Sequence, residues 1–350
     1  MYFIFKRLPL LLLVALVGCD NQFTKIIDDN WIKDPEVCEE DSTTVNFKQV
    51  AYWTPDDSDN IELVDFSMLT HIIYSSIIVN ADASLVMLED DDEELLEDLV
   101  TYAQPYSVKT AVSLGEWVSS NDSNFNTIAG STTLTDTFVD NVIDFLDDYE
   151  LEGVDIHWQT IESDDESDEF EKLLKALSKE LVKEGKFLSM TVPSGEDYKT
   201  ANRISSDLFD YVDFVNVIVF DEVDSDDFNA SLQDAKDAIE YWTDRCLIKN
   251  KLVLGVPFYS VGSTTRSYDY LLRDDLDYVC VDNSRGRDYN GIPTIIDKTD
   301  YALSNAGGMM MRSLEQDVYA RNNDDLDYSE YSLLNVINET VLGNEVSVCQ

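Results

Sequence analysis

Basic residues are scarce in this chain of 350 residues. It carries 24 Lys and Arg against 71 Asp and Glu, which gives a formal net charge of −47 at pH 7. A surface this negative repels phosphate backbones and anionic lipid headgroups, so the composition excludes nucleic-acid binding and polybasic attachment to a membrane. Cationic partners and neutral polar substrates remain.

Histidine is even rarer than lysine or arginine. The chain has two, His71 and His157, and His71 lies in an apolar strand-like segment. A transition-metal site would therefore depend on His157 together with acids such as Asp155 and Asp221. No strict calcium loop, phosphate-binding glycine loop or Ser/His/Asp arrangement is present. We expect no metal and no cofactor.

Long apolar runs are also missing, except for a short one at the start. Lys6 and Arg7 precede an apolar run of about ten residues, Leu8–Val17, which is too short to span a bilayer. The pattern resembles a bacterial lipoprotein signal, in which cleavage before Cys19 leaves that cysteine as the lipid-bearing first residue. The alternative is an ordinary secretory signal in which Cys19 is incidental.

These features divide the chain into a signal peptide at residues 1–18, a polar tether at 19–46 and a folded domain at 47–350. We expect a lipid-anchored location in the bacterial cell envelope, in an unspecified leaflet. Four cysteines remain after Cys19, namely Cys38, Cys246, Cys280 and Cys349. In an oxidising compartment they can form disulfides by three pairings or stay as buried thiols. Cys38 and Cys349, near the two ends of the domain, form the natural pair.

From Phe47 onward, short runs rich in Val, Ile, Tyr and Phe alternate with segments of helical period. This alternation predicts parallel strands joined by helices. The expected strands are Gln49–Trp53, His71–Val79, Thr110–Leu114, Gly153–Trp158, Phe187–Val192, Phe214–Phe220, Leu252–Pro257 and Gly308–Met311. Eight such units in about 300 residues favour a closed (β/α)8 TIM barrel, with catalytic or binding residues at the carboxyl ends of its strands.

The fourth expected strand carries polar residues on one face. Val154, Ile156 and Trp158 alternate with Asp155, His157 and Gln159. The polar set should point into the barrel, where polar groups are costly unless they bond to one another or line a site. This strand is therefore the candidate functional element.

The same segment resembles the catalytic motif of glycoside hydrolase family 18, the chitinases and chitinase-like proteins. The family reads Asp-Gly-x-Asp-x-Asp-x-Glu, and this chain has Glu152-Gly153-Val154-Asp155-Ile156-His157-Trp158-Gln159 at the same spacing. Further segments resemble other strands of the family: Lys109–Trp117, Tyr211–Asp221, Leu254–Tyr259 and Gly307–Asp317. The resemblance implies a TIM barrel with a short insertion between the seventh and eighth strands, within Ser260–Ala306, and a shallow groove.

The resemblance also implies a defect in catalysis. Gln159 stands where the family has its proton-donating glutamate, and an amide cannot protonate a leaving group. His157 replaces the aspartate that orients and charges the substrate's acetamido group, and Phe220 replaces a tyrosine. Arg312 stands where a tryptophan floors the sugar site. We therefore expect no catalytic residue among the degenerate motif positions Glu152, Asp155, His157 and Gln159.

A pocket can survive the loss of its acid. Aromatic rings stack on pyranose faces, and amide and carboxylate groups bond to hydroxyls. The candidate sugar-binding residues are Trp53, Trp117, Asp155, Gln159, Phe220, Asp221, Tyr259 and Arg312. Arg312 should pair with an acid such as Asp221, Asp155 or Glu116, or reach solvent.

Three functions remain open. The first is a membrane-anchored, non-catalytic protein that binds GlcNAc-containing glycans such as chitin, peptidoglycan or glycoprotein sugar. The second is an envelope scaffold for a protein partner, with a vestigial groove. The third is an active hydrolase in which Glu116, Glu152 or Glu162 has become the acid.

Overall fold

The computed structural model describes residues 46–54, 61–87, 92–115, 122–158, 160–195, 198–220, 230–262, 264–272, 276–318 and 329–349. Every described residue belongs to one compact unit within Glu39–Gln350. In the described part of the chain, no helix combines the length and the apolar character needed to cross a bilayer.

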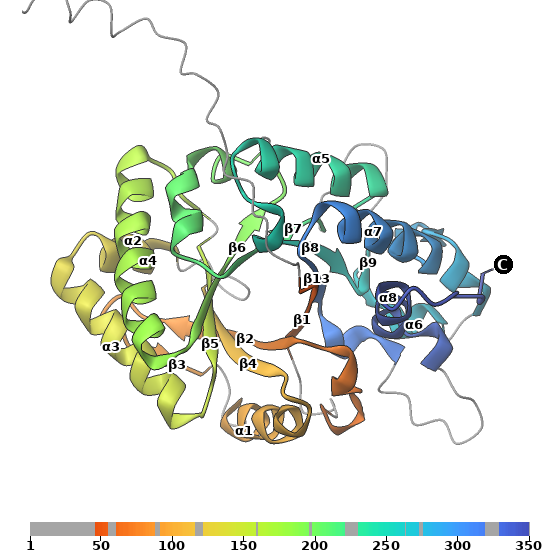
Figure 1. The fold of residues 1–350 in the computed structure, drawn as a ribbon, viewed down its shortest axis with the longest axis horizontal. Coiled ribbons are helices and arrows are strands. Elements are labelled where there is room, and N and C mark those ends of the chain that lie inside the picture. The colour runs from red at the N-terminus through yellow and green to blue at the C-terminus, as the bar shows by residue number, and fades with distance from the viewer. Residues whose placement is uncertain are drawn as a thin grey trace, which may run out of the picture. The chain divides into compact units, whose positions relative to one another are not determined.

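Eight parallel strands close into a barrel (Figure 1). They are β1 (Lys48–Trp53), β2 (His71–Val79), β4 (Lys109–Gly115), β5 (Gly153–His157), β6 (Phe187–Pro193), β7 (Phe214–Ile218), β8 (Leu252–Pro257) and β13 (Gly308–Arg312). Pairing of β1 with both β13 and β2 completes the ring. The predicted (β/α)8 barrel is confirmed, and each of the eight expected strands is present with its ends shifted by two residues or fewer.

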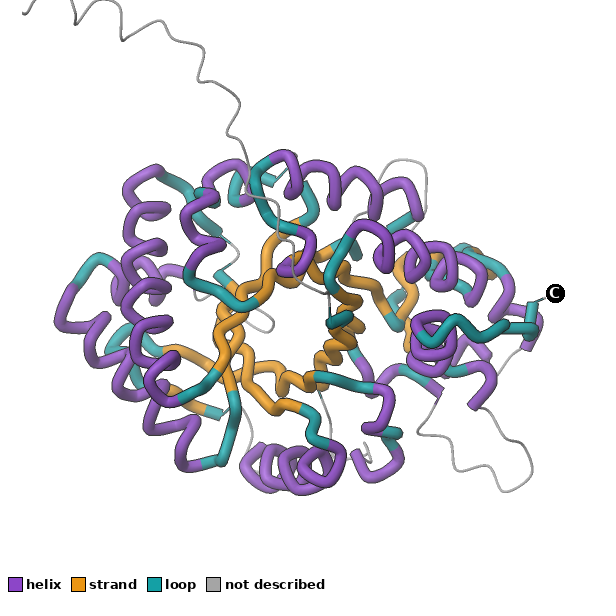
Figure 2. Tube along the Cα trace, viewed as in Figure 1, coloured by secondary structure: helices purple, strands orange, loops and turns teal. Residues whose placement is uncertain are grey.

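Helices surround the strands, as Figure 2 shows. They are α1 (Asp92–Ala103), α2 (Asp122–Ala129), α3 (Thr132–Asp148), α4 (Asp164–Glu184), α5 (Leu232–Asp244), α6 (Tyr268–Leu272), α7 (Ile292–Asn305) and α8 (Leu333–Val341). Serine hydroxyls accept hydrogen bonds from the first free backbone N–H groups of α3, α4, α5 and α8, which fixes where these helices begin.

Short 3-10 helices occupy several of the connections. They are η2 (Ile61–Leu63), η3 (Phe66–Met68), η4 (Gln104–Tyr106), η5 (Ala201–Arg203), η6 (Ser206–Asp210), η7 (Lys249–Lys251), η8 (Leu276–Cys280), η9 (Leu314–Gln316) and η11 (Ser329–Tyr331). Among its described residues, the link between β6 and β7 contains η5 and η6 and no α-helix.

The insertion after β8 is short, as the sequence predicts. It contains β9 (Tyr259–Gly262), β10 (Arg266–Ser267), β11 (Asn283–Ser284) and β12 (Arg287–Asp288), which form a small antiparallel sheet in the order β10-β9-β12-β11. A further short strand, β3 (Leu85–Val86), pairs antiparallel with the end of β2.

The buried apolar residues form two separate clusters. The larger one fills the layer between strands and helices, and the smaller one fills the inside of the barrel. The inner cluster consists of Val50, Tyr52, Ile73, Ala111, Phe187, Phe214, Phe220, Val253, Tyr259 and Met310. Because side chains alternate along a strand, these residues identify the inward faces of β1, β2, β4, β6, β7, β8 and β13.

The prediction that Cys38 pairs with Cys349 is wrong. Cys349 forms a disulfide with Cys280, at a Cα–Cα distance of 5.4 Å. The C-terminal segment that follows α8 runs to η8 of the insertion, which brings residue 349 next to residue 280. Cys246 is also disulfide-bonded, and Cys280 is not its partner.

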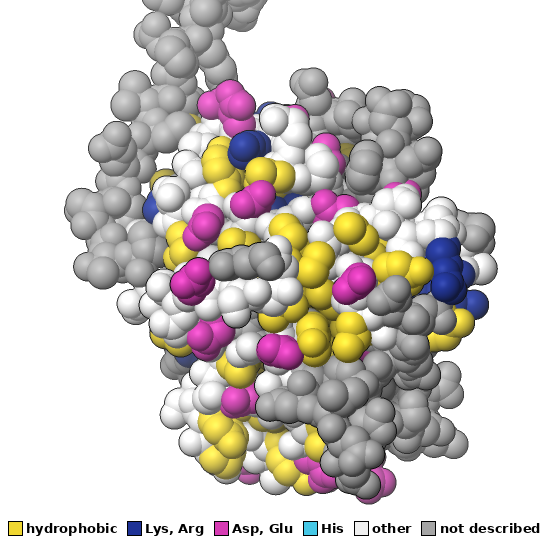
Figure 3. Space-filling model, turned by 90° about the vertical axis from the view of Figure 1, so that its right-hand side faces the viewer, with side chains coloured by type: hydrophobic (Ala, Val, Ile, Leu, Met, Phe, Trp, Pro, Cys, Tyr) yellow, Lys and Arg dark blue, Asp and Glu magenta, His cyan; other side chains and the backbone are white. Residues whose placement is uncertain are grey.

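The face that carries α7 and α8 shows acidic side chains dispersed among apolar ones (Figure 3). A cavity of about 470 Å³ on the outside of the barrel involves both helices and the C-terminal segment. Its lining includes Pro293, Ile296, Val346 and the disulfide-bonded Cys349, so the covalent bond holds one of its walls.

Candidate functional site

Strand β5 presents its polar residues to the barrel interior, as the alternation predicts. Val154, Ile156 and Trp158 belong to the outer apolar cluster. Asp155 lies on the opposite face and is completely buried, and His157 is 2% exposed. The ring of Trp158 stacks on Phe125 outside the strands, which anchors the end of β5 in the helical layer.

Five side chains form hydrogen bonds with the Asp155 carboxylate, and four of them come from strands β4, β6 and β7. Ser189 Oγ and Asn216 Nδ2 donate to Oδ1 over 2.7 and 3.3 Å. Ser113 Oγ and Thr191 Oγ1 donate to Oδ2 over 3.1 and 2.9 Å. Burial raises the pKa of Asp155, while these hydrogen bonds oppose the rise. The carboxylate therefore ties together strands β4, β5, β6 and β7.

Tyr52 extends this network to β1. Its hydroxyl accepts a 2.7 Å hydrogen bond from Asn216 Nδ2 and lies 2.9 Å from Thr191 Oγ1. The Tyr52 hydroxyl also forms a hydrogen bond with the Asp155 carboxylate, and either hydroxyl can be the donor in its contact with Thr191. Burial and the nearby Asp155 raise the pKa of Tyr52 well above its usual value, so this phenol stays protonated.

His157 lies at the carboxyl end of β5, one inward position above Asp155. Burial, and after it the charge of Arg312, lowers the pKa of His157 to about 3. The imidazole is therefore neutral at physiological pH. Gly115 on β4 passes so close that a Cβ atom there would lie 2.0 Å from the backbone oxygen of His157. Only glycine permits this approach between β4 and β5.

Arg312 reaches the same end of the barrel from β13. It is the Cα partner of Tyr52, and it faces inward like Met310, two residues earlier. Its Nη1 donates a 2.7 Å hydrogen bond to Thr54 Oγ1, just after the end of β1. The backbone N–H of Thr54 in turn donates to the Glu315 carboxylate over 3.1 Å. Thr54 thus holds the half-buried guanidinium at the carboxyl end of β13.

Two of the predicted aromatic residues meet inside the barrel. Phe220 and Tyr259 belong to the inner cluster and contact each other edge to face, with ring centroids 6.4 Å apart. Gly255 makes room for this arrangement, since a Cβ atom there would lie 3.1 Å from the Phe220 ring. Tyr259 is 7% exposed, so little of its ring is open to solvent.

Three sequence-based assignments need correction. Trp53 is fully buried in the outer cluster, where its ring packs against Tyr74, because alternation along β1 turns Tyr52 inward and Trp53 outward. The Trp53 ring therefore cannot stack on a sugar. Asp155 gives its acceptor sites to protein donors and is not open to ligand hydroxyls. Glu152 is exposed at the amino end of β5, opposite the site, which excludes it as a relocated acid.

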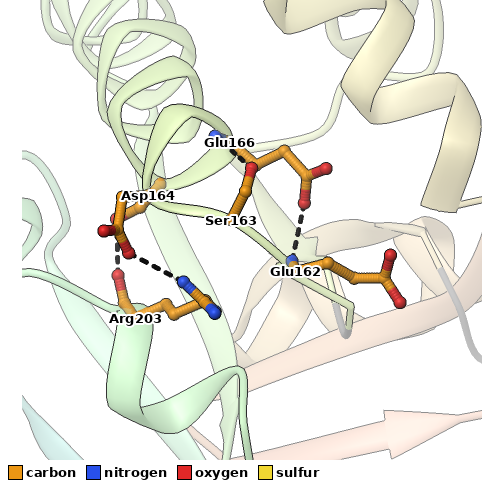
Figure 4. Close-up of polar contacts among 6 residues, drawn as sticks. Glu162, Ser163, Asp164, Glu166 and Arg203 are labelled. Atoms are coloured by element: carbon orange, nitrogen blue, oxygen red, sulfur yellow. Dashed lines mark hydrogen bonds and ion pairs between the residues drawn. The ribbon is translucent and has the colours of Figure 1, made fainter.

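Glu162 follows β5 on the carboxyl side, and its side chain is exposed. Figure 4 shows the contacts at the start of α4. The Glu162 backbone N–H donates to the Glu166 carboxylate over 2.6 Å, and Asp164 pairs with Arg203 over 2.7 Å. These contacts cap and brace α4, and in this view the Glu162 carboxylate points away from the Asp164–Arg203 pair.

Five residues with predicted roles lie outside the described residues, so those roles remain predictions. They are Cys19, Glu116, Trp117, Gln159 and Asp221. Among the residues that are described, no group of three or more His, Cys, Asp or Glu side chains is arranged to hold a metal ion.

Sequence reasoning missed several polar residues of the interior, namely Tyr52, Thr54, Ser113, Ser189, Thr191 and Asn216 as site residues. The sequence contains a pattern that points to two of them, Ser189 and Thr191. Ser189 and Thr191 alternate with apolar residues on β6 as Asp155 and His157 do on β5. Counting inward positions on every strand would have placed them at the level of Asp155.

The closed barrel with a polar site at the carboxyl ends of its strands defines the class as a TIM-barrel protein. The model of the family "Glycosyl hydrolases family 18" matches residues 48–317, and the chain belongs to this family.

Three similar proteins illustrate the relationship. Probable chitinase 10 of Drosophila melanogaster is 22% identical over 299 residues, covering 71% of this chain and 13% of that protein. The GH18 chitinase ChiB from the chitin utilization locus of Flavobacterium johnsoniae superposes with a TM-score of 0.73 at 25% identity, covering 85% of this chain and 94% of that one. Catalytic domain 2 of the Ostrinia furnacalis Group II chitinase, crystallised as a mutant with penta-N-acetylchitooctaose, has a TM-score of 0.73 at 18% identity, covering 87% and 100%. The chain spans half or less of the length of the curated relatives it matches first.

Proposed function

We propose that this protein is a non-catalytic member of the family that binds GlcNAc-containing glycans, such as chitin, peptidoglycan or glycoprotein sugar. One observation carries the proposal: Gln159 stands at the motif's proton-donor position, and the neighbouring inward position holds His157, whose pKa of about 3 keeps it neutral. An amide and a neutral imidazole supply neither the acid nor the negative charge that the family's reaction needs.

The remaining carboxyl inside the barrel cannot replace the lost acid. Among the described residues of the barrel interior, Asp155 is the one acidic side chain, and it is fully buried and held by five hydrogen-bonding side chains. A general acid must reach the leaving oxygen within hydrogen-bond distance. Asp155 instead holds the strands of the site in place, which favours recognition without bond cleavage.

The conserved scaffold supports binding. The Asp155 network fixes five strands at the level just below the site. Above it, the nearly buried Phe220, Tyr259 and His157 shape the interior, and the half-buried Arg312 lies at the carboxyl end of β13. The solved chitinase complex with penta-N-acetylchitooctaose has the same fold, which makes chitooligosaccharides the first ligands to test.

Isothermal titration of the full chain, purified in detergent, with chitooligosaccharides and peptidoglycan fragments tests the proposal. We expect saturable heats with at least one of them. If none of these ligands gives heat, the glycan-binding proposal is wrong. The alternative is then an envelope scaffold for a protein partner, which is favoured by Arg312 at the position of the tryptophan that lines the sugar site in the family. Crosslinking in intact cells followed by pull-down then identifies a protein partner.

We also propose that a lipid on Cys19 anchors the protein in the bacterial cell envelope. The support is the sequence Leu16-Val17-Gly18-Cys19 after a short apolar run. Labelling of cells with a fatty-acid analogue should mark the wild-type chain and not Cys19→Ser. Equal labelling of both chains would contradict the anchor.

A further inference from the structure

The cavity on the outer face of the barrel, formed by α7, the end of α8 and the C-terminal segment, has a volume of about 470 Å³. Ligand pockets usually measure about 300–1,000 Å³. The apolar residues of its lining are Pro293, Ile296, Val346 and Cys349. Leu342, which directly precedes the lining residue Gly343, is 64% exposed. The cavity therefore offers apolar surface that a partner can bury.

The fold holds the walls of this cavity in place. Lining positions 293, 296, 297 and 300 follow helical spacing, so they share one face of α7. Beyond α8, Asn344 donates its backbone N–H to the Glu339 backbone oxygen over 2.9 Å and its side-chain amide to the Glu339 carboxylate over 2.8 Å. The Cys280–Cys349 disulfide fixes the last wall. A site with fixed walls binds a ligand at a lower entropic cost.

The lining face of α7 also carries two carboxylates. Asp297 and Asp300 are exposed, and in the described part of the chain neither side chain forms a hydrogen bond or an ion pair. Glu345 is a third acidic lining residue and already has a contact of its own. None of the described lining residues is basic. Asp297 and Asp300 therefore give an apolar cavity a negative charge that no lining residue neutralises.

The ligand that fits both features carries positive charge next to an apolar group. A purely polar cation would leave the apolar lining in contact with water, and an apolar anion would be repelled by the two aspartates. The two carboxylates lie three residues apart on α7, where side chains are neighbours, so two basic side chains of one polypeptide can reach both of them. A small organic cation with a single charge pairs with one.

We propose that this cavity is a docking site for a protein partner, which inserts an apolar side chain flanked by two basic residues. The apolar side chain fills the cavity, and the basic side chains pair with Asp297 and Asp300. The net charge of −47 accelerates the approach of such a cationic segment. The cavity lies outside the barrel wall, so this inference goes beyond the proposed glycan-binding function and does not depend on it.

Methyl NMR of the full chain at 0.15 M salt tests the proposal with blocked tripeptides. We expect Lys-Phe-Lys to shift the methyl resonances of Ile296 and Val346 saturably. Lys-Gly-Lys, which has the charges without the apolar side chain, should bind at least about tenfold more weakly. Glu-Phe-Glu should cause no saturable shift. Benzylammonium, an apolar cation that is not a polypeptide, should bind more weakly than Lys-Phe-Lys.

Two double variants test the charges. Asp297→Asn with Asp300→Asn should weaken the binding of Lys-Phe-Lys by about 2- to 30-fold, as expected for the loss of two exposed ion pairs. Asp136→Asn with Asp140→Asn is the matched control, because it removes two exposed carboxylates from α3 and changes the net charge equally. It should change the affinity by less than about 1.5-fold.

Several results would overturn this inference. They are no saturable shift at Ile296 and Val346 with Lys-Phe-Lys, equal affinity for Lys-Gly-Lys or for benzylammonium, and equal effects of the two double variants. Titration of the same variants with chitooligosaccharides keeps the two proposals apart. Their glycan affinity should equal that of wild type, so a failure at this cavity leaves the proposed function unaffected.

Discussion

The Ser189 hydroxyl donates a 2.7 Å hydrogen bond to the Asp155 carboxylate across neighbouring strands, at a point where neither side chain is exposed to solvent. Ser113, Thr191, Asn216 and Tyr52 complete the shell around that carboxylate. The Asp155 carboxylate therefore links the strands of the barrel interior by hydrogen bonds and does not act as a catalytic acid.

Replacing Asp155 should therefore cost stability. In Asp155→Asn, one carboxylate oxygen becomes an NH₂ group that faces hydroxyl donors, so we expect the free energy of unfolding to fall by about 1–3 kcal/mol. Urea denaturation measures the change. Glu152→Gln, directly before the same strand, is the control, since its exposed side chain should change stability by less than about 0.5 kcal/mol. Equal effects of the two substitutions would refute the role of the network.

Acid should destabilise the protein through its two histidines. Burial lowers the pKa of His71 and of His157 to about 3, compared with about 6.5 in an unfolded chain. Between these values the unfolded state binds a proton at each imidazole and the folded state does not. Stability should then fall as pH decreases from about 6.5 toward 3, by about 1.4 kcal/mol per pH unit for each histidine.

Variants separate the two contributions. His71→Leu and His157→Asn should each reduce the slope of the unfolding free energy against pH, between pH 6 and pH 4, by about 1.4 kcal/mol per pH unit, which corresponds to one bound proton. Urea titrations at several pH values give the slopes. Because the buried carboxyls Asp155 and Asp317 are common to all three proteins, the difference from wild type isolates the histidine. A variant whose slope equals that of wild type would contradict the assignment for that residue.

The disulfide should stabilise the C-terminal part of the barrel. Cys280 and Cys349 are 69 residues apart, so the bond closes a long loop that includes α7, β13 and α8. Removing it with Cys349→Ser should lower the free energy of unfolding by about 2–4 kcal/mol. Urea denaturation of Cys349→Ser, Cys280→Ser and the double variant checks that the loss comes from this bond, because all three should lose the same free energy while Cys246 keeps its own disulfide.

Restoring the acids tests whether the pocket still seats an N-acetyl sugar. In Gln159→Glu with His157→Asp, the proton donor and the charge of the family motif return together. We expect hydrolysis of a chromogenic chitobioside at least about 100-fold above the wild-type background, because general acid catalysis is typically worth a factor of about 10² to 10⁴. A folded but inert double variant would show that the pocket itself, through Arg312 or Phe220, has changed.

The sequence predicted the barrel and the inward face of β5 because both follow from local patterns. The eight apolar runs and the alternation at residues 154–159 can be recognised without knowing which residues contact one another in the fold. Trp53 was placed on the wrong side because Tyr52 and Trp53 are both aromatic, so the pattern did not show which one faces inward. The bond of Asn216 to Tyr52 could not be foreseen, since residues 164 positions apart meet only when the barrel closes. The Cys280–Cys349 pair likewise depends on the path of the C-terminal segment.

The central claim is that this barrel recognises a glycan and does not cleave it. Incubation of the full chain with a saturating oligosaccharide that it binds by titration, followed by mass spectrometry over several days, tests this claim most directly. The account predicts saturable binding with the oligosaccharide recovered intact. Cleavage products that disappear in Glu116→Gln or Glu162→Gln would contradict it and show that another carboxyl has taken over as the acid.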